Sequence, residues 1–255
     1  MSSQQALIAF LTYSYFKIVP KDIYSNDGEG DYSSYCIKKA IMKAYEDATN
    51  EGAYNTLFQK TIEAEKLKQL KSASERAKND SAEFLFLQIQ KLNSLASNYE
   101  EWHKSTCEGL CKKYSKVCLN ENDPFFRYGN AQKWVNMTMK YLWMLGLLDD
   151  AVDYKKLHIP IDSFIIDALW NDDKIEFPLK SENVNRSKKY AKPSDYVIGW
   201  SRWYKSDYLC KFRKSISSDE FSLEWENDAW IRQAEKRKKA DLKKQYESFF
   251  GEIDT

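Results

Sequence analysis

Apolar side chains recur at helical spacing along most of this chain, and this periodicity limits the folds open to it. Between 131 and 148, residues such as Trp134, Leu142 and Leu145 leave almost no polar stripe. No run alternates apolar and polar residues for long enough to indicate a sheet of several strands. The pattern predicts an all-α protein, and because no internal repeat or linker is evident, we expect one compact helical domain over 1–255.

Capping and turn residues divide the chain into segments. A first helix is expected between the Ser2-Ser3 cap and Val19-Pro20, and a turn is expected at 120–124. Residues 57–78 are polar and predict a solvated helix, whereas a much more apolar segment begins at Ala82. The remaining expected helices span 35–47, 99–119, 131–148, 163–170 and 229–250.

Charge is balanced over the whole chain. It has 39 Lys and Arg against 38 Asp and Glu, so only local patches are able to bind a polyanion. Two such patches are the loop with Arg186, Lys188 and Lys189 and the basic C-terminal helix at 229–250. Because no stretch of about 20 apolar residues and no signal peptide is present, we expect a cytoplasmic protein that does not enter a membrane.

Five cysteines form an odd set in a chain large enough to fold without disulfides, which favours reduced thiols and an intracellular protein. His103, Cys107 and Cys111 share one face of a helix, and Cys118 follows. This spacing differs from the usual zinc and iron–sulfur patterns. Buried, apolar cysteines are the favoured interpretation, and metal binding by the four residues is left open.

Lys133 and Lys140 lie unexpectedly in the most apolar helix of the chain. Desolvation disfavours the protonated form of an amine, and a neutral amine attacks electrophilic carbon to form a Schiff base. Asp162 follows Pro160 at the start of the next expected helix, where a carboxylate caps free N–H groups. Lys133 and Asp162 are 29 residues apart, far enough for a loop to bring them to one cleft. The alternative is an ordinary snorkelling lysine and an ordinary cap.

Residues 125–169 resemble the core of the helix–hairpin–helix DNA glycosylase superfamily. The resemblance rests on Gly129-Asn-Ala-Gln-Lys133, an apolar helix, and Pro160-Ile-Asp162, in the order of the family. The spacing is closest to that of archaeal 8-oxoguanine DNA glycosylases. It implies a helix–hairpin–helix glycosylase fold in which Lys133 attacks C1′ of the target nucleotide and Asp162 assists.

The resemblance also implies a partner and a reaction. The partner is double-stranded DNA with a flipped base, contacted near the hairpin by Arg127, Gly129, Asn130 and Gln132, while the basic loop tracks phosphates. A monomeric glycosylase and AP lyase needs no metal or organic cofactor, and its base is an oxidised guanine or a bulky modified pyrimidine of phage DNA. The alternatives are a non-catalytic DNA-binding protein and a helical protein-interaction module.

Overall fold

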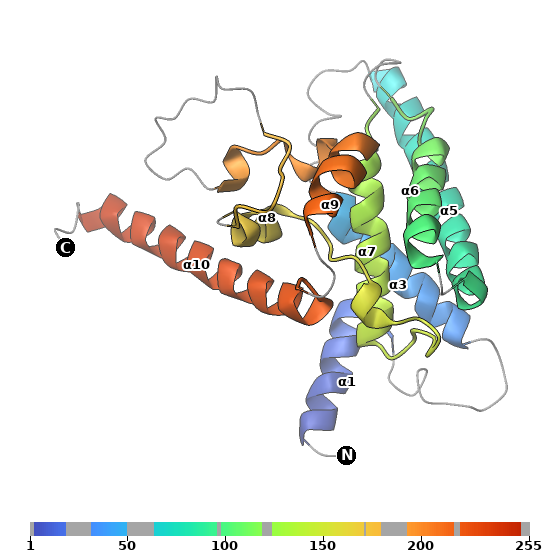
Figure 1. Cartoon of the computed structure of the whole chain (residues 1–255), viewed down its shortest axis with the longest axis horizontal. Coiled ribbons are helices and arrows are strands. Elements are labelled where there is room, and N and C mark those ends of the chain that lie inside the picture. The colour runs from blue at the N-terminus through green and yellow to red at the C-terminus, as the bar shows by residue number, and fades with distance from the viewer. Residues whose placement is uncertain are drawn as a thin grey trace.

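The computed structural model describes residues 3–18, 32–49, 64–95, 98–118, 124–170, 172–179, 193–216 and 220–250. Within them the chain is mainly helical, as the apolar spacing predicted, and β structure is limited to two isolated bridges, Cys118 to Pro124 and Leu179 to Val197 (Figure 1). The longer helices are α1 (Ser3–Phe16), α3 (Tyr32–Thr49), α5 (Ala64–Leu95), α6 (Tyr99–Lys113), α7 (Tyr128–Met144) and α10 (Leu223–Phe250). Of these described helices, none has both the length and the apolar character needed to cross a bilayer.

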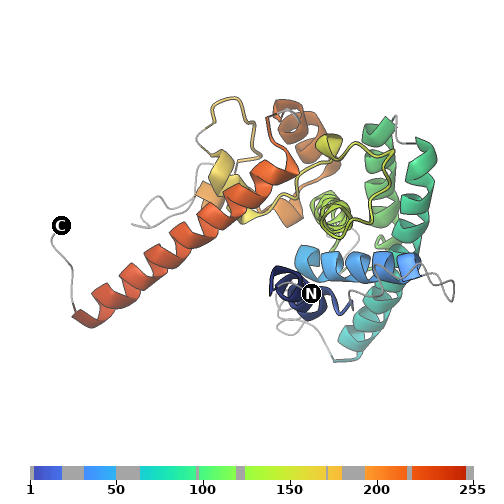
Figure 2. The ribbon, with the colours of Figure 1, turned by 90° about the horizontal axis from the view of Figure 1, so that it is seen from below.

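Helix α7 forms the centre of the fold, with α3 and α6 packed against it (Figure 2). It begins three residues earlier than predicted because Asn130 Oδ1 accepts a hydrogen bond from the backbone N–H of Arg127, 3.1 Å away. This bond satisfies a donor that the helix itself leaves free. The helix ends at Met144, before the predicted 148, and Gly146 follows with a φ of 66°, a conformation that favours glycine.

Helix α5 corrects the expected division at Ala82. Its 32 residues run without a break from Ala64 to Leu95, although the polar half and the apolar half differ in composition. The apolar half packs on α6, so Leu85 and Leu92 are buried. The change in composition therefore marks the point at which one helix passes from solvent into the core. The helix itself continues, because the residues on both sides of this point have a good helix propensity. The predicted start at 57 lies outside the described residues.

Helix α10 extends away from the other helices and contacts the body mainly through α8 (Ser163–Leu169) (Figure 1). Arg237 holds the two together: its guanidinium donates to Asp167 Oδ2 at 2.6 Å and to the Ser163 carbonyl at 2.8 Å, and it lies 3.8 Å from the centre of the Phe164 ring. The part of the basic helix at 229–250 nearest the body is therefore fastened by one of its own arginines.

A polar network lies in the core between α6, α7 and the π-helix Ser206–Phe212. His103 Nε2 is 2.8 Å from Asn136 Oδ1, and His158 Nδ1 is 3.2 Å from the Tyr208 hydroxyl. His158 Nε2 lies 3.0 Å from both Arg213 Nε and Glu100 Oε1. Burial lowers the pKa of both histidines.

We expect acid to weaken the fold through these two histidines. Their folded pKa values lie below the unfolded value of 6.5, so below that pH the unfolded chain binds more protons and stability falls. Each histidine lowers the free energy of unfolding by up to about 1.4 kcal/mol for each pH unit below its unfolded pKa. Hydrogen bonding to His158 lowers the pKa of Glu100 from 4.5 to about 2. Glu100 therefore changes the free energy of unfolding only below pH 4.5, outside the range in which the histidines are tested. Urea unfolding at pH 7.5, 6.5 and 5.5 checks this, and equal stabilities would contradict it.

Candidate functional site

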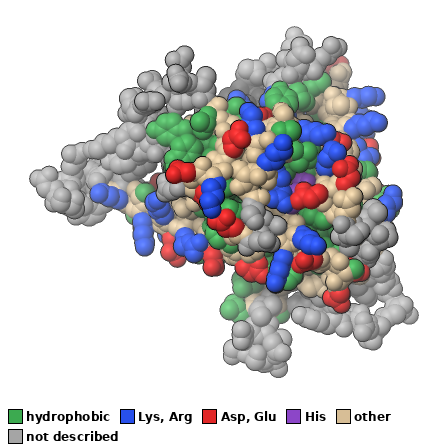
Figure 3. All heavy atoms as spheres, in the orientation of Figure 1, with side chains coloured by type: hydrophobic (Ala, Val, Ile, Leu, Met, Phe, Trp, Pro, Cys, Tyr) green, Lys and Arg blue, Asp and Glu red, His purple; other side chains and the backbone are tan. Residues whose placement is uncertain are grey.

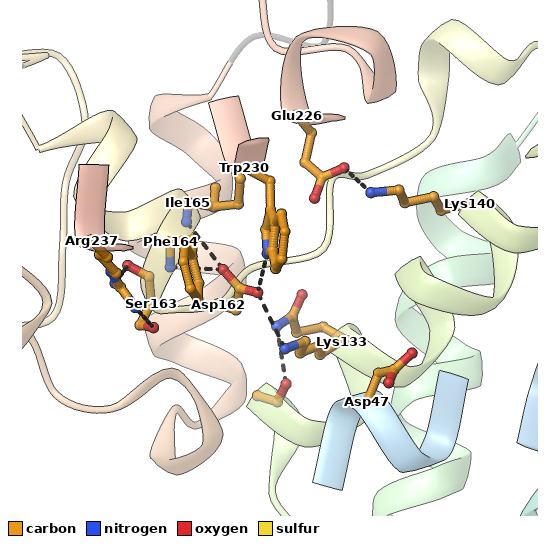
Figure 4. Close-up of polar contacts among 12 residues, drawn as sticks. Asp47, Lys133, Lys140, Asp162, Ser163, Phe164, Ile165, Glu226, Trp230 and Arg237 are labelled. Atoms are coloured by element: carbon orange, nitrogen blue, oxygen red, sulfur yellow. Dashed lines mark hydrogen bonds and ion pairs between the residues drawn. The ribbon is translucent and has the colours of Figure 1, made fainter. Parts of the chain in front are cut away.

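Lys133 and Asp162 meet at one site. The Nζ atom of Lys133 lies 3.5 Å from Asp162 Oδ2, and both side chains are largely buried (Figure 4). Lys133 comes from the second turn of α7, and Asp162 immediately precedes α8. The loop of 145–162, which leads back from the end of α7, carries the carboxylate to the amine, as their spacing predicted.

Asp162 is the N-cap of α8, which confirms the predicted cap. Its Oδ1 accepts hydrogen bonds from the backbone N–H groups of Phe164, at 2.8 Å, and Ile165, at 3.1 Å. Its Oδ2 faces Lys133 and also accepts from the indole Nε1 of Trp230, at 3.3 Å. One oxygen is thus fixed by the helix and the other is presented to the amine, so the carboxylate has little freedom to rotate.

The pair lines a cleft of about 840 Å³. This volume lies within the range of about 300 to 1,000 Å³ that small-molecule sites occupy. Two tryptophans flank the pair: the Lys133 amine lies 4.5 Å from the centre of the Trp200 ring, and Trp230 stacks on Phe164 at 4.8 Å between ring centroids. The cleft therefore brings an amine, a carboxylate and flat aromatic surfaces to one place.

A second ion pair lines the same cleft. Lys140, on α7, donates to the carboxylate of Glu226, on α10, and both residues are buried (Figure 4). Burial raises the pKa of Glu226, while the Lys140 charge opposes this effect. Each lysine of the cleft is therefore paired with a carboxylate from a different element.

Gly129 marks a close approach between two backbones. A Cβ at this position would lie 1.8 Å from the carbonyl oxygen of Trp200. The Gly129 amide donates to the Trp203 carbonyl at 3.0 Å. The glycine thus allows the turn that carries Trp200 to lie against the start of α7, and its amide, which the resemblance assigned to DNA, is used inside the protein.

A Gly129→Ala substitution should destabilise the fold and displace Trp200. The new methyl group meets a backbone atom that cannot rotate away, so we expect a loss of about 1–3 kcal/mol. Gly199→Ala is the matched control, because a Cβ there has no atom within 4 Å. Urea unfolding of both variants measures the difference, and equal stabilities would show that the Trp200 turn moves without cost.

The other residues predicted to contact DNA near the start of α7 have structural partners. Gln132 is fully buried, and its amide donates to the Gly129 carbonyl at 3.0 Å. Asn130 is buried at the start of α7. Arg127 reaches the surface, where it donates to the Arg202 carbonyl at 3.3 Å and lies 4.9 Å from the Tyr204 ring centre. Of these side chains, Arg127 reaches the surface, and its contact with a phosphate stays a prediction.

The basic patches remain predictions. Arg186, Lys188 and Lys189 lie outside the described residues. On α10, the exposed basic side chains around and beyond Arg237 include Lys236, Lys238, Lys239 and Lys243. Figure 3 shows basic and acidic side chains interspersed on the face that it presents, so that face carries no broad positive patch.

The five cysteines are free thiols, as predicted. Cys107 Sγ lies 3.7 Å from His103 Nε2, within the buried network of α6. Among the described residues, no three or more His, Cys, Asp or Glu side chains are grouped so that they can hold a metal ion. Burial raises the pKa of Cys111 to about 12, which keeps that thiol protonated.

The sequence did not identify several groups that line the cleft. Tyr15 from α1, Asp47 from α3 and Tyr141 from α7 form its far wall, and Glu226 and Trp230 come from α10. Glu226 and Trp230 are four residues apart and therefore share one helix face, which was an available signal. Tyr15 and Asp47 carried no such signal, because their helices are far from Lys133 in the sequence.

Comparison with known proteins gives no counterpart for this arrangement. No family model, curated protein or solved structure matches the chain.

Proposed function

We propose that this protein is a DNA glycosylase, with AP lyase activity, on a helix–hairpin–helix glycosylase scaffold. The observation that carries the proposal is the pairing of the Lys133 amine with the capping carboxylate of Asp162 in a cleft of about 840 Å³. A base must leave the DNA stack before its glycosidic bond is attacked, and an extruded base needs a pocket with aromatic surfaces. Trp200, next to the Lys133 amine, and Trp230, next to Asp162, offer such surfaces in the cleft.

In the proposed reaction, Asp162 takes a proton from Lys133 and the neutral Nζ attacks C1′ of the extruded nucleotide. The C1′–N bond breaks, and the base leaves with the bonding electrons and takes up a proton. The nitrogen then loses a proton while the sugar ring opens and its oxygen is protonated, which leaves an imine between Lys133 and C1′. Removal of a C2′ proton expels the 3′ phosphate and nicks the strand, and water releases Lys133.

The substrate is a damaged or modified base, either oxidised guanine or a bulky modified pyrimidine of the kind found in phage DNA. The cleft volume lies in the upper part of the usual range, which favours the larger of these bases. Excision of the first would serve DNA repair, and excision of the second would serve phage defence.

Borohydride trapping tests the proposal directly. The protein is incubated with duplexes that each carry one altered base, and the reductant converts the imine into a stable amine. We expect a covalent adduct with at least one duplex, and peptide mapping should place the adduct on Lys133. Base release without an adduct would point to a monofunctional enzyme that uses water, with Asp162 as the base.

Two other outcomes would replace the proposal. Salt-dependent duplex binding without base release or adduct would define a non-catalytic DNA-binding protein. Absence of any duplex binding at low salt would favour a helical protein-interaction module.

A further inference from the structure

The far end of the cleft holds a group of oxygen atoms that the proposed reaction does not use. The Tyr15 hydroxyl lies 2.9 Å from Asp47 Oδ2 and 2.7 Å from the Tyr141 hydroxyl. The Tyr141 hydroxyl also donates to Asp47 Oδ2. Figure 4 shows Asp47 on the opposite side of Lys133 from Asp162. These three residues line the same cleft as Lys133, so a ligand that reaches past the amine meets them.

This group has fewer hydrogen atoms than hydrogen-bonding contacts. Three oxygen pairs are in contact, but only the two phenol hydrogens are available to them. Burial and the neighbouring Asp47 charge raise the pKa of Tyr15 and Tyr141, so both phenols stay protonated at neutral pH. Lys43 donates to the other oxygen of Asp47, at 3.1 Å, and so leaves Oδ2 to the two phenols. The group therefore has spare lone pairs that can accept hydrogen bonds from donors on a ligand.

The charges around this end of the cleft also favour a ligand that donates hydrogen bonds and carries a positive charge. Its lining contains four carboxylates and two lysines, namely Glu46, Asp47, Asp162, Glu226, Lys133 and Lys140. Each lysine is paired with a carboxylate across the cleft, which leaves Glu46 and Asp47 at the end with the tyrosines. Lys43 bridges these two carboxylates and offsets part of their charge. An anionic group is repelled from this end, while a cation is attracted.

We propose that this end of the cleft binds an aminoalkyl substituent of the extruded base, with Asp47 as the partner of its ammonium group. The identification of the ligand as a base rests on the proposed function, whereas the preference for an amine rests on the cleft itself. An ammonium group brings three donors and a positive charge, so it supplies the missing hydrogens and pairs with the carboxylate. A hydroxyl brings one donor and no charge, and a carboxylate brings no donor and a negative charge.

Free nucleosides test the preference without any reaction. The probes are deoxyuridines that carry an aminomethyl, a hydroxymethyl or a carboxyl group at C5, and calorimetry measures their binding to the full-length protein. We expect the aminomethyl nucleoside to bind about tenfold more tightly than the hydroxymethyl one, and the carboxyl one to bind most weakly. Equal binding of the three, or no binding of the aminomethyl nucleoside, would overturn the inference.

Two substitutions locate the preference. Asp47→Asn keeps the shape of the side chain but removes its charge, and Tyr141→Phe removes one hydroxyl. Asp47→Asn should reduce the tenfold preference for the aminomethyl over the hydroxymethyl nucleoside to about onefold to threefold. Tyr141→Phe should reduce this preference less. Glu83→Gln, on the exposed face of α5 and paired there with Lys38, is the matched control and should leave the preference unchanged. An unchanged preference in both cleft variants, with folding verified by thermal unfolding, would overturn the role of Asp47.

Trapping with duplex DNA separates this inference from the proposed function. The same three bases are placed in duplexes and treated with borohydride. Amine-selective nucleoside binding without any adduct or base release would reject the glycosylase but support the amine site. Adduct formation at equal rates with all three bases would support the glycosylase and reject the amine site.

Discussion

Replacement of Lys133 by glutamine should abolish the borohydride adduct and slow base release by at least about a thousandfold. An amide nitrogen is not a nucleophile, so the step that joins protein and sugar cannot occur. Glutamine is one bond shorter than lysine but keeps a polar, uncharged end, and Asp162 Oδ1 is still fixed by the N-terminus of α8. The site should therefore keep its shape, and the loss should appear in the single-turnover rate of base release more than in the affinity for DNA.

Lys104→Gln serves as the control for this experiment. Lys104 is on the outer face of α6, where it pairs with Glu101, and its substitution removes a lysine of the same charge far from the cleft. Its adduct yield should equal that of the wild type. If Lys133→Gln retained the adduct, the nucleophile would be a different amine, and Lys140 in the same cleft would be the first to examine by peptide mapping.

Replacement of Trp134 by alanine should cost about 3–5 kcal/mol of the free energy of unfolding. Trp134 has no exposed surface, packs edge-on against Tyr45 at 4.8 Å between ring centroids, and donates from its indole nitrogen to the Ile41 carbonyl at 2.9 Å. Truncation leaves a cavity between α3 and α7 and removes the donor of a buried hydrogen bond. Because typical domains are stable by only about 5–15 kcal/mol, this loss should be evident in urea unfolding.

Trp230→Ala is the matched comparison, because it removes the same side chain from a position that is 40% exposed. Its cost should be much smaller, since part of the ring already contacts solvent and the surrounding residues line an open cleft. A similar loss in both variants would mean that the α3–α7 contact is not the main source of stability at Trp134.

Much of the helical framework follows from local patterns. The most apolar segment became the central helix α7, and Pro160-Ile-Asp162 became the capped start of α8, because caps and amphipathic stripes depend on residues close in sequence. The division at Ala82 was wrong because a change in composition was interpreted as a helix end. Solvent exposure can change along one helix while its backbone hydrogen bonds continue.

The candidate site was predictable in part. Lys133 and Asp162 stand out because each is unusual for its local setting, and the short segment between them limits how far apart they can lie. Asp47 and Tyr15 belong to helices of ordinary appearance, and Lys140 has its partner Glu226 at a sequence separation of 86 residues. Such pairs depend on how helices pack, which local spacing does not report.

The amino-acid sequence alone determined the helical class, the caps and the chemical nature of the amine and the carboxylate at the candidate site, since these depend on side-chain chemistry and on neighbours within a few residues. The tertiary structure decided which groups share the cleft, and it placed Asp47 in the same cleft as Asp162. It also decided that the Gly129 amide donates to the Trp203 carbonyl and that Arg237 joins α10 to α8. The physical reason is that burial and pairing free energies depend on distance in space, and distant segments come together only when the core is packed.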